Sequence, residues 1–209
     1  MKSITTLNKP SKTDYQKHMS IFNSKYANKF CFAHSTIIDN IFKQYKKNVI
    51  AYNYVKAAII DYAYSTRVKH MDELVLNIAN IKNFDSLVSK GDPNLVNDMK
   101  KVALNNDEEI NYLSYSSKYC HRYNPKEYPI YDSYVERVLR TYQKQFRFFD
   151  DSIKKITKES LKDYVFYKEV VDAFINKYKS IGIDNYIKFD RYLWTVGRES
   201  FKIYGDWKH

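Results

Sequence analysis

The sequence predicts an all-α protein, and three observations carry that prediction. The 209 residues include only four glycines and four prolines, so long segments run without a residue that breaks a helix. Apolar residues make up 44% of the chain, which is typical of a packed globular protein. Apolar side chains recur three and four residues apart in most segments, and no segment alternates convincingly as a strand would.

The elements follow from this spacing in chain order. Residues 1–13 are polar and contain Pro10, and we expect a flexible basic arm there. Helices are predicted over 14–32, 35–47, 53–64, 68–81, 94–104, 133–149, 164–179 and 186–204. Between residues 107 and 123, a shorter helix is expected to carry Lys118.

Stop and cap residues divide these segments. Gly91-Asp92-Pro93 predicts the end of one helix and the start of the next. Gly182 is expected to end the helix before it. The predicted N-caps are Ser35, Asp184, and either Asn106 or Asp107.

Charge is unevenly distributed along the chain. The net charge is +11, and residues 1–56 hold ten lysines against two aspartates, which leaves +8 in that part. A second basic feature is a stripe on the helix predicted over 133–149, formed by Arg137, Arg140, Lys144 and Arg147. Such a stripe can follow a phosphate backbone, although an ordinary solvated helix face has the same pattern.

Several classes of site and location are not indicated. Cys31 and Cys120 are far apart and belong to no metal-binding motif, so no metal or other cofactor is expected. No segment has the apolar length of a membrane span, and no signal sequence is evident. We therefore expect a cytoplasmic protein with reduced thiols and no membrane partner.

Lys118 and Asp132 are the residues from which chemistry is expected. They flank a turn that contains Pro125 and Pro129 and leads into the next helix. A lysine that loses its proton is a nucleophile and forms Schiff bases, and an aspartate can stabilise positive charge that develops on a sugar. His121 and Arg122 are close enough in sequence to influence Lys118.

Structural roles are the alternative for both residues. Lys118 can be a solvated helix lysine, and Asp132 can be only a helix cap. The Ser133–Glu136 segment also fits a capping box, so either Ser133 or Asp132 can cap the helix that follows. In the first case the Asp132 carboxylate is left free, and in the second it is held at the helix N-terminus.

Two stretches are distinctive: Ser-Lys-Tyr-Cys-His from Ser117 and Tyr-Pro-Ile-Tyr-Asp-Ser from Tyr128. They resemble a group of small bacterial proteins, and that group is similar to the 8-oxoguanine branch of the helix-hairpin-helix DNA glycosylases. Further agreement comes from Tyr64-Ser65-Thr66, from Gly91-Asp92 with Leu95-Val96, and from Asp190-Arg191-Tyr192-Leu193-Trp194. The glycine-containing hairpin of those glycosylases has no counterpart in residues 111–117.

The resemblance implies a single helical domain over 14–209 with two lobes, one formed by 50–130 and the other by 14–49 with 131–209. It also implies a glycosylase, with possible lyase activity, that excises an oxidised purine from damaged double-stranded DNA. Lys118 would be the nucleophile, Asp132 its electrostatic assistant, and the basic stripe would contact the DNA backbone. Two other functions remain open: a non-catalytic nucleic-acid-binding protein of mobile-element or phage-defence biology, and a helical interaction module.

Overall fold

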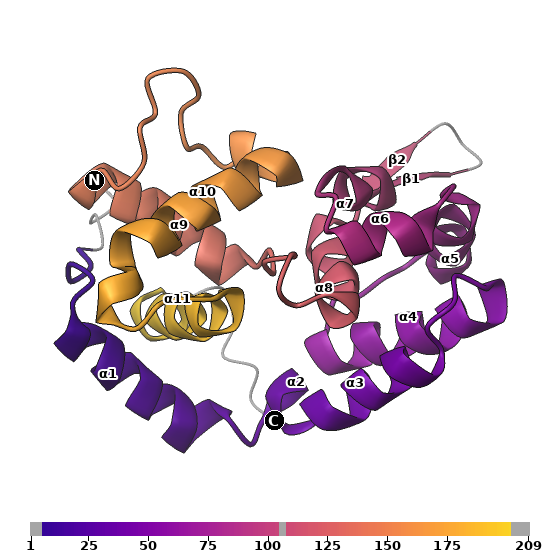
Figure 1. Ribbon diagram of the computed structural model, residues 1–209, viewed down its shortest axis with the longest axis horizontal. Helices are drawn as coiled ribbons and strands as arrows, with labels where there is room; N and C mark the ends of the chain where they lie inside the picture. The colour runs from indigo at the N-terminus through magenta and orange to yellow at the C-terminus, as the bar shows by residue number, and fades with distance from the viewer. Residues whose placement is uncertain (1–5, 105–107, 202–209) are drawn as a thin grey trace.

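A computed structural model describes residues 6–104 and 108–201, apart from the side chains of Phe30 and Cys31. The described chain is mostly helical, which confirms the predicted class at that level. The helices lie in two groups on either side of a central segment (Figure 1). The chain passes between the groups twice, and the second passage carries the candidate site.

The first group contains α1 (Lys12–Ile21), α9 (Ser133–Phe146), α10 (Tyr164–Tyr178) and α11 (Tyr186–Ser200). Helix α9 buries the apolar stripe that the sequence predicted, including Val135, Val138 and Leu139, against α11. Gly197 of α11 allows this close approach, because a Cβ atom there would lie 2.7 Å from the Cβ of Tyr134. The start of α9 is therefore held tightly on α11.

The second group surrounds α8 (Leu113–Tyr123), which packs on α3 (Ser35–Gln44), α4 (Ile50–Tyr64), α6 (Phe84–Lys90) and α7 (Asn94–Met99). Helix α5 (Met71–Asn80) covers α4. Leu113 and residues 115–121 of α8 are buried, and this set includes both polar and aromatic side chains. Because most of the surface of α8 is buried, the ammonium group of a lysine on this helix lies away from water and needs a polar partner or a cavity beside it.

Two short segments connect the groups. The first passage consists of the π-helical residues Phe22–Tyr26 and then α2 (Phe30–Ala33). The second is the turn over residues 124–132, which lies in the middle of the molecule (Figure 1). Tyrosine hydroxyls hold this turn: Tyr164 donates to the carbonyl of Pro129 at 2.7 Å, and Tyr167 donates to that of Ile130 at 2.5 Å.

The prediction of helix over 94–104 is wrong after Met99. Residues Lys101–Ala103 form strand β1, which pairs antiparallel with β2 (Glu109–Asn111). Three residues give too short an alternation for a strand pattern to stand out in the sequence. The side-chain amide of Asn77 donates hydrogen bonds to the carbonyls of Met99 and Lys101, which stabilises the non-helical backbone after Met99.

Other boundaries differ by local capping. The predicted helix over 14–32 begins earlier, because Ser11 caps α1 by accepting from the N–H of Asp14, and it is interrupted after Tyr26. Ser35 is the first residue of α3 rather than its cap. Asn185, not Asp184, caps α11 by accepting from the N–H of Lys188. Gly91 and Gly182 do end their helices, each with a positive φ.

The expected grouping of residues also needs correction. The lobe expected from 14–49 with 131–209 includes α3. The structure instead packs α3 on α4 and α8, so α3 belongs to the group around α8. Part of the expected flexible arm is anchored, because Leu7 is buried and its N–H donates to Oε1 of Gln145. Residues 1–5, the predicted caps Asn106 and Asp107, and the end of the helix predicted to 204 lie outside the described residues.

Candidate active site

Lys118 and Asp132 meet where the chain returns from α8 to α9. The Lys118 Nζ lies 3.8 Å from Oδ2 of Asp132, and the two side chains are 6% and 20% exposed. Lys118 is therefore not a solvated helix lysine. Its ammonium also donates to the Ser114 hydroxyl at 2.5 Å, one turn earlier on α8.

Asp132 has a structural and an electrostatic contact at the same time. Its Oδ1 accepts from the N–H of Tyr134 at 2.8 Å, so Asp132, rather than Ser133, is the N-cap of α9. Its Oδ2 remains for Lys118. The two alternatives left open by the sequence are thus resolved: the cap fixes the carboxylate at the helix N-terminus, with one oxygen directed to the lysine.

The backbone before Asp132 is fixed from the same helix that carries Lys118. The Ser117 hydroxyl accepts from the N–H of Tyr131 at 3.0 Å. His121 Nδ1 donates to the carbonyl of Tyr128 at 2.7 Å. Together with the tyrosines of α10, these contacts determine the distance between the lysine and the aspartate.

A cavity of about 100 Å³ lies on the far side of Tyr64 and Asp190, two residues that interact with Lys118 and also line the cavity, whereas Lys118 and Asp132 themselves do not line it. Its wall includes both apolar and charged side chains: Phe32, Ser35, Asp39, Tyr64, His121, Arg122, Pro125, Ile130, Ile187, Asp190 and Arg191. Its lining residues come from α2, α3, the end of α4, α8, the central turn and α11.

Asp190 is a member of this site that sequence reasoning did not select. It is 8% exposed, and its carboxyl interacts electrostatically with Asp132 and Lys118. Burial, with a smaller contribution from Asp132, raises the pKa of Asp190 to about 7. The sequence does contain a signal for Asp190, because the Asp190–Trp194 stretch is one of those that carry the family resemblance.

The two supporting residues behave differently from each other. Burial lowers the pKa of His121 to about 4, so its ring is neutral at pH 7 and adds no positive charge near Lys118. Arg122 is held in place by Asp39 at 2.8 Å, by the Tyr64 hydroxyl at 2.9 Å and by Ser35.

Tyr64 links the lysine to this arginine. Its ring centroid lies 5.4 Å from Lys118 Nζ and 5.4 Å from Arg122 Cζ. The turn that follows contains two non-glycine residues with positive φ, Ser65 and Arg67, and Asp61 accepts hydrogen bonds from Thr66 and Val68 within it. Such strained backbone persists only where the surroundings hold it, and it is common near functional sites.

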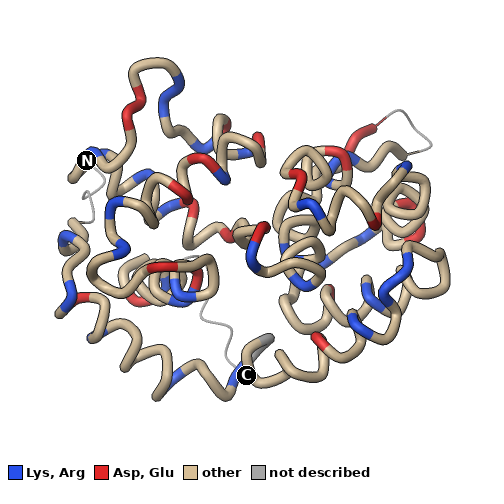
Figure 2. Tube along the Cα trace, viewed as in Figure 1, with Lys and Arg blue, Asp and Glu red and all other residues tan. Residues whose placement is uncertain are grey.

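The basic stripe of α9 is only partly available. Arg140 forms an ion pair with the buried Glu136, which compensates its charge. Arg137, Lys144 and Arg147 are exposed. The Arg137 guanidinium lies 4.2 Å from the centroid of the Phe201 ring. Basic residues also occur on the other helix group, so positive charge is not confined to this helix (Figure 2).

No group of three or more His, Cys, Asp or Glu side chains among the described residues is arranged to hold a metal ion. None of the helices in ranges 6–104 and 108–201 has both the length and the apolar character needed to cross a membrane. Burial raises the pKa of the Cys120 thiol, which removes it as a candidate nucleophile.

The fold and the site define a helical protein in which a half-enclosed lysine–aspartate pair lies at a helix N-terminus. Residues 14–127 match the HI_0787_N family, described as an N-terminal domain, and the chain belongs to that family. An uncharacterized protein of Haemophilus influenzae (strain ATCC 51907 / DSM 11121 / KW20 / Rd) is 34% identical over 138 residues. This match spans 66% of the chain and 62% of the relative. No solved structure matches the chain.

Proposed function

We propose that this protein is a DNA glycosylase-like enzyme that removes a damaged base through a Schiff base on Lys118. The observation that carries the proposal is the 3.8 Å separation between Lys118 Nζ and Asp132 Oδ2, with the lysine side chain only 6% exposed. The resemblance of the same two segments to helix-hairpin-helix glycosylases supplies the substrate class. An oxidised purine in duplex DNA is the first substrate to test.

The reaction requires three events at this site. The Lys118 amine, after losing a proton, attacks C1′ of the deoxyribose while the bond from C1′ to the base breaks and the base leaves with the electron pair. Asp132 stabilises the positive charge that develops on the sugar. Opening of the sugar ring then gives a protonated imine between Lys118 and C1′, from which strand cleavage by β-elimination can follow.

Asp190 is suited to the proton transfers. A carboxyl with a pKa of about 7 takes up and releases protons near neutral pH, which is what a general acid–base group needs. It can accept the proton that Lys118 must lose and later return a proton to the departing base. The flipped base would enter the cavity from the stack, beside the ring of Tyr64.

Borohydride trapping tests this proposal. Duplexes that carry 8-oxoguanine or an abasic site are incubated with the protein, borohydride is added, and a covalent adduct is sought on a denaturing gel. We expect an adduct with the wild-type protein that is absent in Lys118→Gln. Lys126→Gln is the matched control, because Lys126 is an exposed lysine of the central turn.

Two results would overturn the proposal. One is the absence of an adduct with both substrates when circular dichroism shows folded protein. The other is an adduct of equal yield in Lys118→Gln, which would assign the reaction to another amine. An adduct with the abasic site alone would retain the Schiff base and reject 8-oxoguanine as the substrate.

A second candidate function is binding of nucleic acid without catalysis. The observation that favours it is that residues 111–117, where the glycosylases have a glycine-containing turn, form the end of β2 and the first turn of α8. Exposed cations on α9 would then supply the backbone contacts. Each phosphate contact contributes a slope of about −0.9 to the dependence of log K on log salt, so Lys144→Gln should reduce the slope by about one unit. Binding that Lys118→Gln leaves unchanged, with no trapped adduct, would favour this function.

A further inference from the structure

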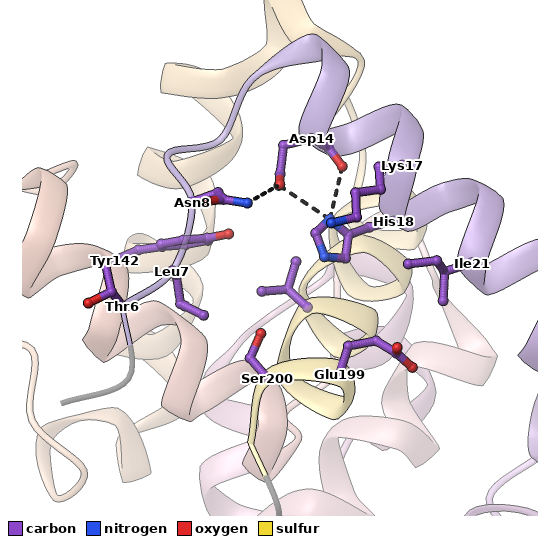
Figure 3. Close-up of a pocket in the computed structure, with 11 residues that line it drawn as sticks. Thr6, Leu7, Asn8, Asp14, Lys17, His18, Ile21, Tyr142, Glu199 and Ser200 are labelled. Carbon is purple, nitrogen blue, oxygen red and sulfur yellow. Dashed lines mark hydrogen bonds and ion pairs between the residues drawn. The ribbon is translucent and has the colours of Figure 1, made fainter. Parts of the chain in front are cut away.

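A second cavity lies in the first helix group, apart from the Lys118 site. Its volume is about 270 Å³, slightly below the range of roughly 300 to 1,000 Å³ for drug-sized ligands. Its lining comes from the segment before α1, from α1 itself, and from α9 and α11 (Figure 3). None of the residues that line it also lines the cavity next to Tyr64 and Asp190.

His18 presents one ring nitrogen to this cavity. Its Nδ1 donates to the carbonyl of Asp14 at 2.9 Å and lies 3.3 Å from the Asp14 carboxylate. The other nitrogen, Nε2, points to the interior of the cavity (Figure 3). The side chain is 9% exposed, so this nitrogen is a polar group in a nearly buried position.

Asp14 and the groups around it determine the charge of the ring. Burial by itself lowers the pKa of His18, but the hydrogen bonds and the charge of Asp14 outweigh it, and the pKa is raised above its ordinary value. The Asp14 carboxylate is itself held by the Tyr192 hydroxyl at 2.6 Å and by Asn8 at 3.5 Å. The protonated ring is thereby favoured, with Nε2–H as a donor toward the cavity.

The other charged side chains that line the cavity are Glu199 and Lys17. Glu199 is already paired with Lys25 at 3.1 Å and accepts from the Tyr26 hydroxyl at 2.6 Å, and its carboxylate is directed away from His18 (Figure 3). Lys17 lies at the exposed edge of the cavity and forms none of the ion pairs found among residues 6–104 and 108–201. A ligand with a single negative charge would complete this arrangement.

The other walls favour a ligand with an apolar body. Leu7, Ile21 and Val196 contribute aliphatic surface, and Tyr142 contributes an aromatic ring. The Ser200 hydroxyl points inward and can add a hydrogen bond (Figure 3). An inorganic anion would leave this apolar surface unfilled, whereas an organic acid would cover it.

We propose that this cavity binds a small organic carboxylate, with its carboxylate at His18 Nε2 and Lys17 and its apolar part against Leu7, Ile21 and Val196. The proposal does not depend on the reaction at Lys118. Its site is built from α1, α9 and α11 together with the segment that precedes α1.

Titration with three probes tests it. Benzoate, the neutral benzamide and inorganic phosphate are each added to the full chain, and the imidazole nitrogens are followed by NMR, with His18→Gln used to assign the resonance among the five histidines. We expect saturable shifts at His18 with benzoate and none with benzamide or phosphate. Loss of the His18 or Lys17 cation should weaken binding roughly 10- to 100-fold. Lys12→Met is the control for Lys17→Met, because Lys12 is an exposed residue of the same helix that does not line the cavity.

Each of the three probes has a result that would contradict part or all of the proposal. Equal binding of benzamide would reject recognition by charge, and equal binding of phosphate would reject the role of the apolar wall. No binding of benzoate would overturn the site altogether. Benzoate affinity should also fall as pH rises through the pKa of His18, because the neutral ring no longer attracts a carboxylate. The charged and titratable groups that face this ring are Asp14 and Lys17 of α1, Tyr142 of α9, and Tyr192 and Glu199 of α11.

Discussion

The hydroxyl of Tyr167 donates a 2.5 Å hydrogen bond to the carbonyl of Ile130, and this contact ties α10 to the turn that ends at Asp132. Both residues are buried, so water cannot replace the bond if it is lost. The position of the aspartate thus depends on a helix that contributes no residue to the catalytic pair. A buried tyrosine has this effect because its ring fills the core while its hydroxyl reaches a backbone acceptor.

Tyr167→Phe should destabilise the protein while leaving its volume nearly unchanged. The Ile130 carbonyl would lose its partner, at a cost of about 1–3 kcal/mol. Urea unfolding measures this loss. Tyr62→Phe is the control, because Tyr62 is 79% exposed and its hydroxyl is solvated in either state. Equal midpoints for the two variants would contradict the importance of the bond.

Asp132→Asn should separate the two contacts of this residue. Asparagine is as good an N-cap as aspartate, so α9 keeps its cap and the stability changes little. The negative charge beside Lys118 is lost, and we expect the rate of adduct trapping to fall by about 100-fold or more. Asp132→Ala removes the cap as well and should cost about 1 kcal/mol in addition. An asparagine variant that traps at the wild-type rate would show that the charge is not needed.

Asp190 makes stability depend on pH in a defined window. Burial raises its pKa from 3.8 to about 7, so between these values the folded protein binds more protons than the unfolded chain. The stabilisation is present below pH 4 and is lost as pH rises through 7. Asp190→Asn should remove this loss, which amounts to a few kcal/mol. Urea unfolding at pH 5 and pH 8 tests it, with exposed Asp98→Asn as the control; an unchanged pH dependence in Asp190→Asn would contradict the assignment.

Gly197→Ala should destabilise the protein despite the better helix propensity of alanine. The propensity gain is about 1 kcal/mol. The new Cβ, however, would lie 2.7 Å from the Cβ of Tyr134 and 3.1 Å from its carbonyl oxygen, and backbone atoms cannot rotate aside. Such overpacking costs about 1–3 kcal/mol. Thermal unfolding measures the balance of the two effects. A Tm above that of the wild-type protein would contradict the overpacking and would show that α9 and α11 can move apart to admit the new Cβ atom.

Much of the helical pattern was readable because it depends on local spacing. The stripe of α9, the glycine ends at Gly91 and Gly182, and the segment around Lys118 were all visible in the sequence. The strand Lys101–Ala103 was not, since its three residues pair only with residues that follow in a hairpin. The placement of α3 was also missed, because its apolar face does not specify which neighbour it covers.

The sequence by itself determined the helical class, the uneven charge and the choice of Lys118 and Asp132 as a pair, because these depend on residue type and spacing along one chain. Only the tertiary structure decided that Asp132 both caps α9 and faces Lys118, that His121 is neutral, and that Asp190 joins them. The pKa values of buried groups follow from the solvent they lose and the charges they approach. Those neighbours come from α8, α9 and α11, which meet only when the chain has folded.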